Sequence, residues 1–195
     1  MNYFVRLGED TRIISGKYKG RKLLSPNSDS KTRPTLDRTK ETLFNILQFS
    51  IENSVVLDLF SGSGALGLEC VSRGAREVVF VDNNKSSVEL IKKNCQLVGH
   101  NGNVILFDYA NFLNSYEGQK FDIIFIDPPY NSDFYKIALE IISSRNLLNA
   151  DGIISCEHSA TVQLPDKVGM MEKSSIRKVG LVEFSFYTLC KEEKK

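Results

Sequence analysis

The feature that most constrains the fold is a glycine-rich turn between an apolar run and a helical pattern. The run is VVLDLF (55–60), and it is followed by SGSGALG, which contains Gly62 and Gly64. A short apolar run of this kind is typical of a buried parallel strand, and a helix is expected from about Ala65 to Arg73. Glycines at such a turn let the backbone approach a ligand, and the helix N-terminus offers unpaired N–H groups. The segment therefore predicts a ligand-binding loop in an α/β protein.

The rest of the chain continues this alternation. Strands are predicted at residues 77–82, 104–107, 121–127 and 152–155, and helices from Thr35, over 86–98 and over 133–144. Residues 182–189 alternate apolar and polar side chains, as an antiparallel edge strand does. Residues 12–24 predict a small N-terminal β-hairpin. This order implies right-handed βαβ crossovers and an α/β, Rossmann-like, doubly wound sheet that is mostly parallel, with an antiparallel C-terminal strand.

Acidic residues end the second and third of these strands. Asp82 closes EVVFVD, and Asp108 follows VILF. At the carboxyl edge of an open α/β sheet, Asp82 can accept hydrogen bonds from both hydroxyls of an adenosine ribose. Asp108 can accept one from the exocyclic amine of adenine. Alone, Asp82 is equally compatible with a solvated strand end, and Asp108 is more typical of an ordinary loop. Together with the glycine loop they indicate a cofactor that contains adenosine, and these features suit NAD and S-adenosylmethionine equally.

The fourth strand ends in the tetrapeptide Asp127-Pro128-Pro129-Tyr130. The two prolines stiffen the backbone and remove N–H donors, which leaves carbonyl oxygens free to accept from a substrate. The carboxylate of Asp127 adds an acceptor, and the ring of Tyr130 offers a face on which a base can stack. These groups would hold a nucleobase amine in line with a methyl donor and stabilise the positive charge that develops on nitrogen. A bare tetrapeptide is more often a proline turn with a packed tyrosine, but its place in this sheet favours the chemical interpretation.

The net charge of +1 hides an uneven distribution. The first 40 residues hold ten basic and four acidic side chains, a net charge of +6, so the remaining 155 residues sum to −5. Any single lysine here is more typical of a solvated arm, but a basic cluster of this kind suits contact with the phosphates of a nucleic acid. The basic residues assigned to nucleic-acid binding are Lys17, Lys19, Arg21, Lys22, Arg33 and Arg38.

Other features restrict the class of protein. The four cysteines are far apart and there are two histidines, so neither a metal site nor a redox pair is expected. No secretory signal or membrane-spanning run is evident, and we expect a cytoplasmic monomer without a membrane partner. Cys156 and His158 flank Glu157, but no third partner supports nucleophilic catalysis. A core cysteine and a surface histidine are expected instead.

The motifs resemble those of class I S-adenosylmethionine-dependent methyltransferases, in which the amino-methylating branch has a [DN]PP[YF] motif. The closer resemblance is to the RsmD family, and it spans nearly the whole chain. Its segments, in order, are RIISGKYKGRKL, RPTLDRTKETLFNIL, VLDLFSGSGALGLECVSRGA and FIDPPY. The resemblance implies transfer of a methyl group from S-adenosylmethionine to the N2 amine of the guanine at position 966 of 16S ribosomal RNA in the small subunit, with S-adenosylhomocysteine as the product.

The resemblance also assigns residues. Cofactor binding falls to Phe60, Gly62, Gly64, Asp82, Asn83, Asp108 and Thr35, and catalysis falls to Asp127, Pro128, Pro129 and Tyr130. Thr35 belongs to Arg33-Pro34-Thr35, which is similar to an element that closes over the methionine end of the cofactor. Tyr130 stands where many members have phenylalanine, which blurs the boundary with adenine-N6 enzymes. Residues 1–34 form the basic arm, and residues 35–195 form the methyltransferase domain.

Three alternatives remain open. An NAD-dependent dehydrogenase would use GSGALG, but it leaves DPPY without a role. A DNA adenine-N6 or protein-glutamine methyltransferase would share the same amine chemistry. An RNA-binding assembly factor would keep a cofactor pocket without turnover.

Overall fold

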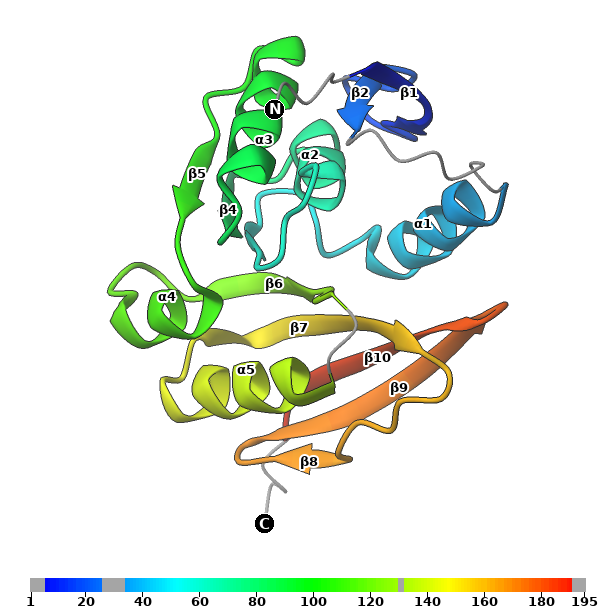
Figure 1. The fold of residues 1–195 in the computed structure, drawn as a ribbon. Helices are drawn as coiled ribbons and strands as arrows, with labels where there is room; N and C mark the ends of the chain where they lie inside the picture. The colour runs from blue at the N-terminus through cyan, green and yellow to red at the C-terminus, as the bar shows by residue number, and fades with distance from the viewer. Residues whose placement is uncertain (1–5, 26–33, 130–131, 191–195) are drawn as a thin grey trace.

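A mixed sheet of eight strands forms the centre of the molecule (Figure 1). The computed structural model describes residues 6–25, 34–129 and 132–190. The strands of the large sheet are β3 (Val55–Asp58), β4 (Glu77–Asp82), β5 (Asn103–Leu106), β6 (Phe121–Ile126), β7 (Leu148–Ser159), β8 (Lys167–Val168), β9 (Met171–Val179) and β10 (Val182–Leu189). Their order across the sheet is β5-β4-β3-β6-β7-β10-β9-β8. The first five are parallel, and the last three join by antiparallel pairing.

Helices cover both faces of the sheet (Figure 1). The first face carries α1 (Pro34–Leu47), α2 (Ala65–Ser72) and α3 (Lys85–Leu97), and the second carries α4 (Tyr109–Ser115) and α5 (Ser132–Ser144). Phe44 of α1 and Leu68 of α2 belong to one buried cluster, whereas Leu113 of α4 and Leu139 of α5 belong to another. Because both faces are buried, the central strands are apolar without alternation. The doubly wound α/β fold predicted from the sequence is confirmed.

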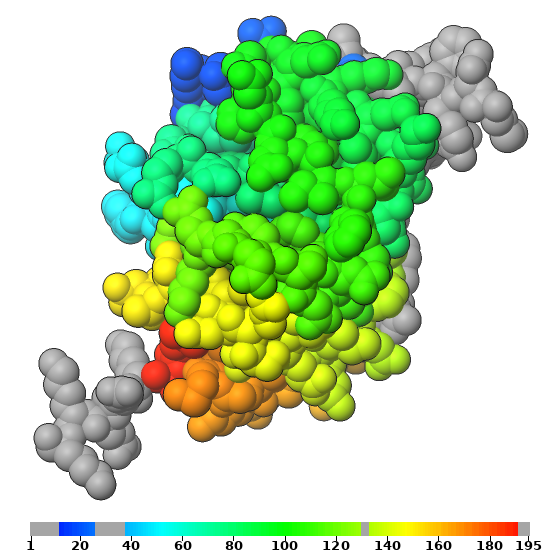
Figure 2. Space-filling model, turned by 90° about the vertical axis from the view of Figure 1, so that its left-hand side faces the viewer, coloured from blue at the N-terminus to red at the C-terminus, as the bar shows by residue number. Residues whose placement is uncertain are grey.

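The N-terminal segment forms a separate two-stranded antiparallel sheet of β1 (Arg6–Arg12) and β2 (Lys22–Ser25). This confirms the hairpin, although its first strand begins at Arg6, before the predicted residues 12–24, and shares only Arg12 with them. Ile13 and Leu23 are fully buried in the cluster beneath α1–α3. Figures 1 and 2 show this segment at the opposite end of the molecule from β8 and β9. The arm is therefore part of the α1–α3 face; its boundary at residue 34 stays a prediction.

Two details of the sheet differ from the expectation. β10 is not an edge strand, because β9 pairs with it on the side away from β7 and covers it. Its residues from Phe184 to Tyr187 are consequently all buried. The strands β8 and β9 and the short helix α4 had no counterpart in the sequence analysis. Among the described residues, no helix is both long and apolar enough to cross a membrane.

Candidate active site

Hydrogen bonds within the protein hold the glycine loop against the neighbouring strand. Gly62 and Gly64 have φ angles of 54° and 77°, in the left-handed region that favours glycine. The Ser61 hydroxyl donates to the Asp58 carbonyl at 2.6 Å and accepts from the Val81 N–H at 3.0 Å. The loop is thus pinned between β3 and β4, and the N-terminus of α2 follows it directly. This is the arrangement that the sequence predicted for the loop.

Gly67 lets α2 pack closely on β4. A Cβ atom at this position would lie 2.3 Å from Cε1 of Phe80 and 2.9 Å from Cγ1 of Val78. Both neighbours are buried side chains in the α1–α3 cluster, so they have little room to move. The close approach of helix and strand brings the loop to the carboxyl edge of the sheet.

We expect Gly67→Ala to lower the free energy of unfolding by about 1–3 kcal/mol because the added methyl overpacks this contact. In an ordinary helix the same change stabilises by up to about 1 kcal/mol. Urea unfolding measures the difference, with Gln96→Ala at an exposed position of α3 as the control. An alanine variant as stable as the wild type would show that α2 and β4 are less tightly packed.

The Asp82 carboxylate stands at the end of β4, beside the glycine loop. Its Oδ2 accepts from the Gly62 N–H at 2.9 Å, and its Oδ1 accepts from the Asn84 N–H at 2.8 Å. Each oxygen keeps a second lone pair, so two hydroxyl donors can still be accommodated. Asn83, the next residue, is exposed. Asp82 is therefore held in a position that suits the predicted ribose contact, which stays a prediction.

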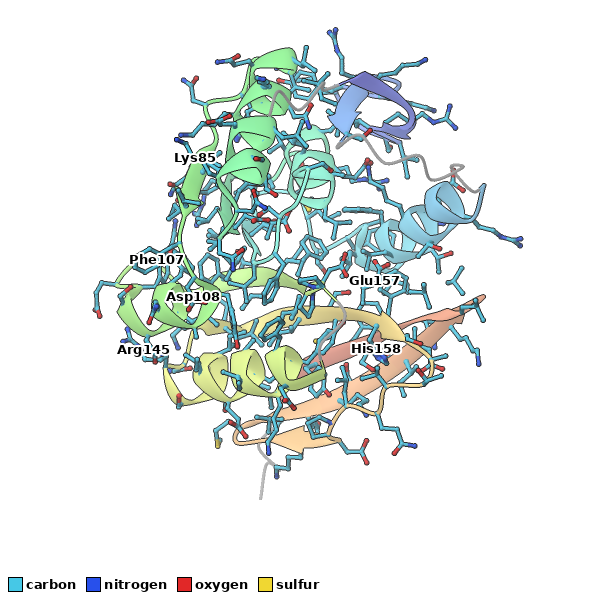
Figure 3. The ribbon with its side chains drawn as sticks, viewed as in Figure 1. Lys85, Phe107, Asp108, Arg145, Glu157 and His158 are labelled. Atoms are coloured by element: carbon cyan, nitrogen blue, oxygen red, sulfur yellow. The ribbon has the colours of Figure 1, made fainter. Side chains whose placement is uncertain are left out.

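Asp108 begins the helix that the sequence analysis missed. Its Oδ1 accepts from the N–H groups of Ala110 at 3.1 Å and Asn111 at 3.0 Å, which makes it the N-cap of α4. No hydrogen bond to its Oδ2 is found within the described part of the chain. Figure 3 shows Phe107 and Asp108 where β5 leads into α4. Asp108 thus has a structural role, and one oxygen remains for an amine.

Phe60 lies at the centre of an aromatic group below the loop. Its ring centre is 5.0 Å from that of Tyr109 and 6.1 Å from that of Phe134. Phe60 is half-buried. Phe60 thus links the glycine loop to the start of α4 and to α5.

Asp127 directly follows β6, and Pro128 behind it is buried while Pro129 is exposed. Asp127 is exposed by its surface area, but the protein around its carboxylate removes part of the hydration and raises its pKa. Tyr130 and Arg33 lie outside the described residues. The three described residues of the predicted catalytic motif therefore stand at the carboxyl edge, one strand from the glycine loop.

A second carboxylate, which the sequence analysis did not assign, lies beneath this edge. Asp58 at the end of β3 is buried, and its pKa is raised to about 7, chiefly by that burial and further by the charges of Asp127 and Asp82. A hydrogen bond of 3.0 Å from the Gly67 N–H partly opposes the shift. Because β3 pairs in parallel with both β4 and β6, the carboxylates of Asp58, Asp82 and Asp127 lie where these three neighbouring strands end. Asp58 could have been predicted from the sequence by the same argument as Asp82, because it stands at the end of an apolar strand.

Four basic residues of the arm surround one groove of about 560 Å³, which is lined by Lys17, Tyr18, Lys19, Gly20, Arg21, Lys22 and Leu97. The Lys17 ammonium lies 5.2 Å from the centre of the Tyr18 ring. Arg38 is exposed on α1, and Thr35 lies in the first turn of that helix. Four of the six predicted RNA-contacting side chains therefore share one surface.

The Cys156–His158 segment departs in part from the expectation. Cys156 is fully buried, and burial raises the pKa of its thiol, so it is the expected core cysteine. His158 is also buried, which corrects the expected surface position, and its Nε2 lies 2.8 Å from the Ser185 hydroxyl. The cause is β10, which covers this side of β7.

Comparison with known proteins identifies relatives along most of the chain. The family model described as Conserved hypothetical protein 95 matches residues 11–188. The chain is 35% identical to the Haemophilus influenzae ribosomal RNA small subunit methyltransferase D, over 91% of this chain and 93% of that protein. It is 36% identical to the protein of the same name from Escherichia coli K12, over 79% and 77%.

Solved structures agree with the fold. The Escherichia coli protein yhhF matches with a TM-score of 0.81 and 30% identity, covering 91% of this chain and 97% of that one. A Thermus thermophilus 16S rRNA N2 methyltransferase, solved with AdoMet and guanosine, matches with a TM-score of 0.72 and 22% identity. That match covers 97% of this chain and 50% of the other, and it concerns the fold alone.

Proposed function

The chain belongs to the Conserved hypothetical protein 95 family, the RsmD family, and from this premise we propose that it methylates the N2 amine of a guanine, at position 966, in 16S ribosomal RNA. The methyl donor is S-adenosylmethionine. Its relatives are named as methyltransferases of small-subunit ribosomal RNA, which supports the reaction class and the substrate class. The choice of guanine and of position 966 rests on family membership.

One observation carries the proposal: ligand-type groups converge where neighbouring parallel strands end. The glycine loop follows β3, Asp82 ends β4, and Asp127 with Pro128 follows β6. The remaining lone pairs of Asp82 suit ribose hydroxyls, and the free oxygen of Asp108 suits the adenine amine. Carboxylates at such an edge also favour a cationic ligand. The residues present therefore fit S-adenosylmethionine, which supplies an electrophilic methyl group on a sulfonium when bound.

The chain's own part in the reaction falls to the Asp127 motif. The exocyclic amine of guanine is a poor nucleophile because its lone pair is delocalised into the ring. Hydrogen bonds from this amine to the Asp127 carboxylate and the Pro128 carbonyl would orient the nitrogen and stabilise the positive charge it gains. The same carboxylate, whose pKa is already raised, can then take a proton. We propose direct in-line transfer with no metal and no covalent intermediate, and we assign base stacking to Tyr130.

The test compares three substrates with labelled S-adenosylmethionine: small ribosomal subunits that lack the modification, naked 16S ribosomal RNA, and DNA. Nucleoside analysis of the products is expected to give N2-methylguanosine from ribosomal RNA. N6-methyladenosine as the product would overturn the assignment. Calorimetric titration should show binding of S-adenosylhomocysteine and none of NAD, which separates a methyltransferase from a dehydrogenase.

The basic groove of the arm is the proposed contact with RNA phosphates. Lysine and arginine side chains around one groove release counterions when they bind phosphate, which makes affinity depend on salt. Tyr18 lies among them and can stack on a base. Arg33 and Arg38 are proposed as further contacts with RNA phosphates, and Thr35 at the start of α1 is proposed as a contact with the methionine end of the cofactor. The target base must leave its stack to reach the Asp127 motif.

Replacing Lys17, Lys19, Arg21 and Lys22 together by alanine is expected to weaken RNA binding and flatten its salt dependence. Because the four cationic side chains can no longer neutralise phosphates, the slope of log affinity against log salt should fall in magnitude by about 3. Fluorescence anisotropy with 16S RNA fragments at several salt concentrations measures this slope.

The matched control removes four exposed lysines remote from the arm, Lys120, Lys136, Lys167 and Lys178. It should leave the slope near the wild-type value, and both variants should bind S-adenosylhomocysteine normally. If the arm variant binds RNA as the wild type does, the groove is not the contact surface.

We further propose that the protein acts as a monomer in the cytoplasm, where its ribosomal substrate is found.

A further inference from the structure

Glu157 stands beside Asp127 on the neighbouring strand. The parallel strands β6 and β7 pair as far as Ile126 opposite Cys156, and Asp127 and Glu157 are the next residue on each chain segment. The charge of Asp127 acts on Glu157, which places the two carboxylates near each other. Ile126 and Cys156 both belong to the cluster beneath α4 and α5. Because successive side chains of a strand point to opposite faces, Glu157 of β7 faces the α1 side, opposite to Cys156.

The backbone around Glu157 is held firmly. The Tyr135 hydroxyl of α5 donates to the Glu157 carbonyl at 2.5 Å. The next residue, His158, contacts the Tyr135 ring at 6.1 Å between ring centres and lies 2.8 Å from the Ser185 hydroxyl. Figure 3 shows Glu157 and His158 on opposite sides of β7. The strand end that carries Glu157 is therefore fixed by neighbours on the far side of the sheet.

The carboxylate of Glu157, in contrast, has no hydrogen-bond or ion-pair partner among the described residues. It is half-buried, and burial together with the charge of Asp127 raises its pKa. Two adjacent carboxylates without donors destabilise each other when both are ionised. A ligand with two adjacent N–H donors would relieve this and favour the charged form of both. The two carboxylates therefore favour a ligand that presents two adjacent N–H donors along one edge.

We propose that Glu157 accepts a hydrogen bond from N1–H of the guanine whose N2 amine Asp127 holds, and that it thereby selects guanine over adenine. This rests on the proposed function. On guanine, the N2 amine is adjacent to the N1–H donor. On adenine, the amine is flanked by the acceptor nitrogens N1 and N7, and on cytosine by the acceptor N3. A second carboxylate beside the first attracts guanine and repels the other two bases.

The test uses small subunits reconstituted with 16S ribosomal RNA that carries either guanine or 2-aminopurine at the methylated position. 2-Aminopurine keeps the 2-amine, but its N1 has a lone pair in place of the hydrogen. Wild-type kcat/KM is expected to be about 10- to 100-fold lower on 2-aminopurine, as for the loss of a specific base contact. Glu157→Gln should lose activity on guanine and narrow or invert this ratio, because its amide can donate to N1.

The change in the ratio, rather than either rate, decides the question, since differences in amine reactivity cancel between the two proteins. Glu140→Gln, at an exposed position of α5, is the control and should keep the wild-type ratio. S-adenosylhomocysteine should bind both variants as tightly as the wild type. If the wild type methylates guanine and Glu157→Gln keeps its ratio, this inference alone is wrong. If the wild type does not methylate guanine, the proposed function itself fails.

Discussion

Asp127→Ala is expected to reduce methyl transfer to ribosomal RNA by about 10²- to 10⁴-fold, the usual contribution of a positioned proton acceptor. The carboxylate follows β6 directly, and its raised pKa brings it nearer to the range in which a general base works at neutral pH. Alanine removes the acceptor without disturbing the glycine loop. The loss should therefore appear in kcat, with RNA and S-adenosylhomocysteine still bound.

Single-turnover assays with labelled S-adenosylmethionine measure the chemical step, and calorimetry and anisotropy measure the two binding steps. Asp127→Asn is the matched control: it keeps an acceptor oxygen of the same shape and should retain more activity than alanine. An alanine variant with the wild-type rate would remove Asp127 from the mechanism. Equal inactivity of wild type and variant, with RNA binding intact, would favour the assembly factor without turnover.

The central strands were predictable because burial on both faces leaves them continuously apolar. β4 was predicted at residues 77–82, and it has those bounds in the structure. The strand β9 shows the opposite case: it has the polar sequence MEKSSIRKV, and most of its side chains are exposed. It is a strand because it pairs with β10, and such a tertiary cause leaves no local pattern. The same pairing explains why β10 was mistaken for an edge.

The site was predictable where a residue ends a recognisable strand. Asp82 and Asp127 follow apolar runs, and parallel strands bring their carboxyl ends to one edge. Asp108 was placed by the same argument, but its cap on α4 was not foreseen, because the helix has only seven residues and a weak pattern. Glu157 was not assigned, because the predicted strand ended at residue 155 whereas β7 continues to Ser159. Its position beside Asp127 depends on the register between β6 and β7, which a single sequence does not reveal.

Glu69 anchors the arm, and nothing in its sequence context indicates this role. It is fully buried on α2, and its carboxylate accepts from the N–H groups of Ile14 at 2.8 Å and Ser15 at 2.9 Å. Lys40 of α1 at 3.0 Å and Arg73 at 2.8 Å form ion pairs with it. One side chain therefore joins the arm, α1 and α2, the helix that follows the glycine loop.

Glu69→Ala should lower the free energy of unfolding by about 3–5 kcal/mol, because it leaves two cations and two backbone donors without this acceptor. Urea unfolding measures the difference, and Glu89→Ala, exposed on α3, should stay within about 0.5 kcal/mol of the wild type. Because the hydrogen bonds to Glu69 hold residues 14 and 15, limited proteolysis should cleave the arm of the variant before the rest of the chain. Two other side chains also hold the arm: the Ser72 hydroxyl accepts from the Tyr18 N–H at 2.9 Å, and the Asn94 side-chain oxygen accepts from the Leu24 N–H at 2.7 Å. A decrease in the free energy of unfolding below about 1 kcal/mol, with the arm still protected from proteolysis, would mean that these two contacts suffice to anchor it.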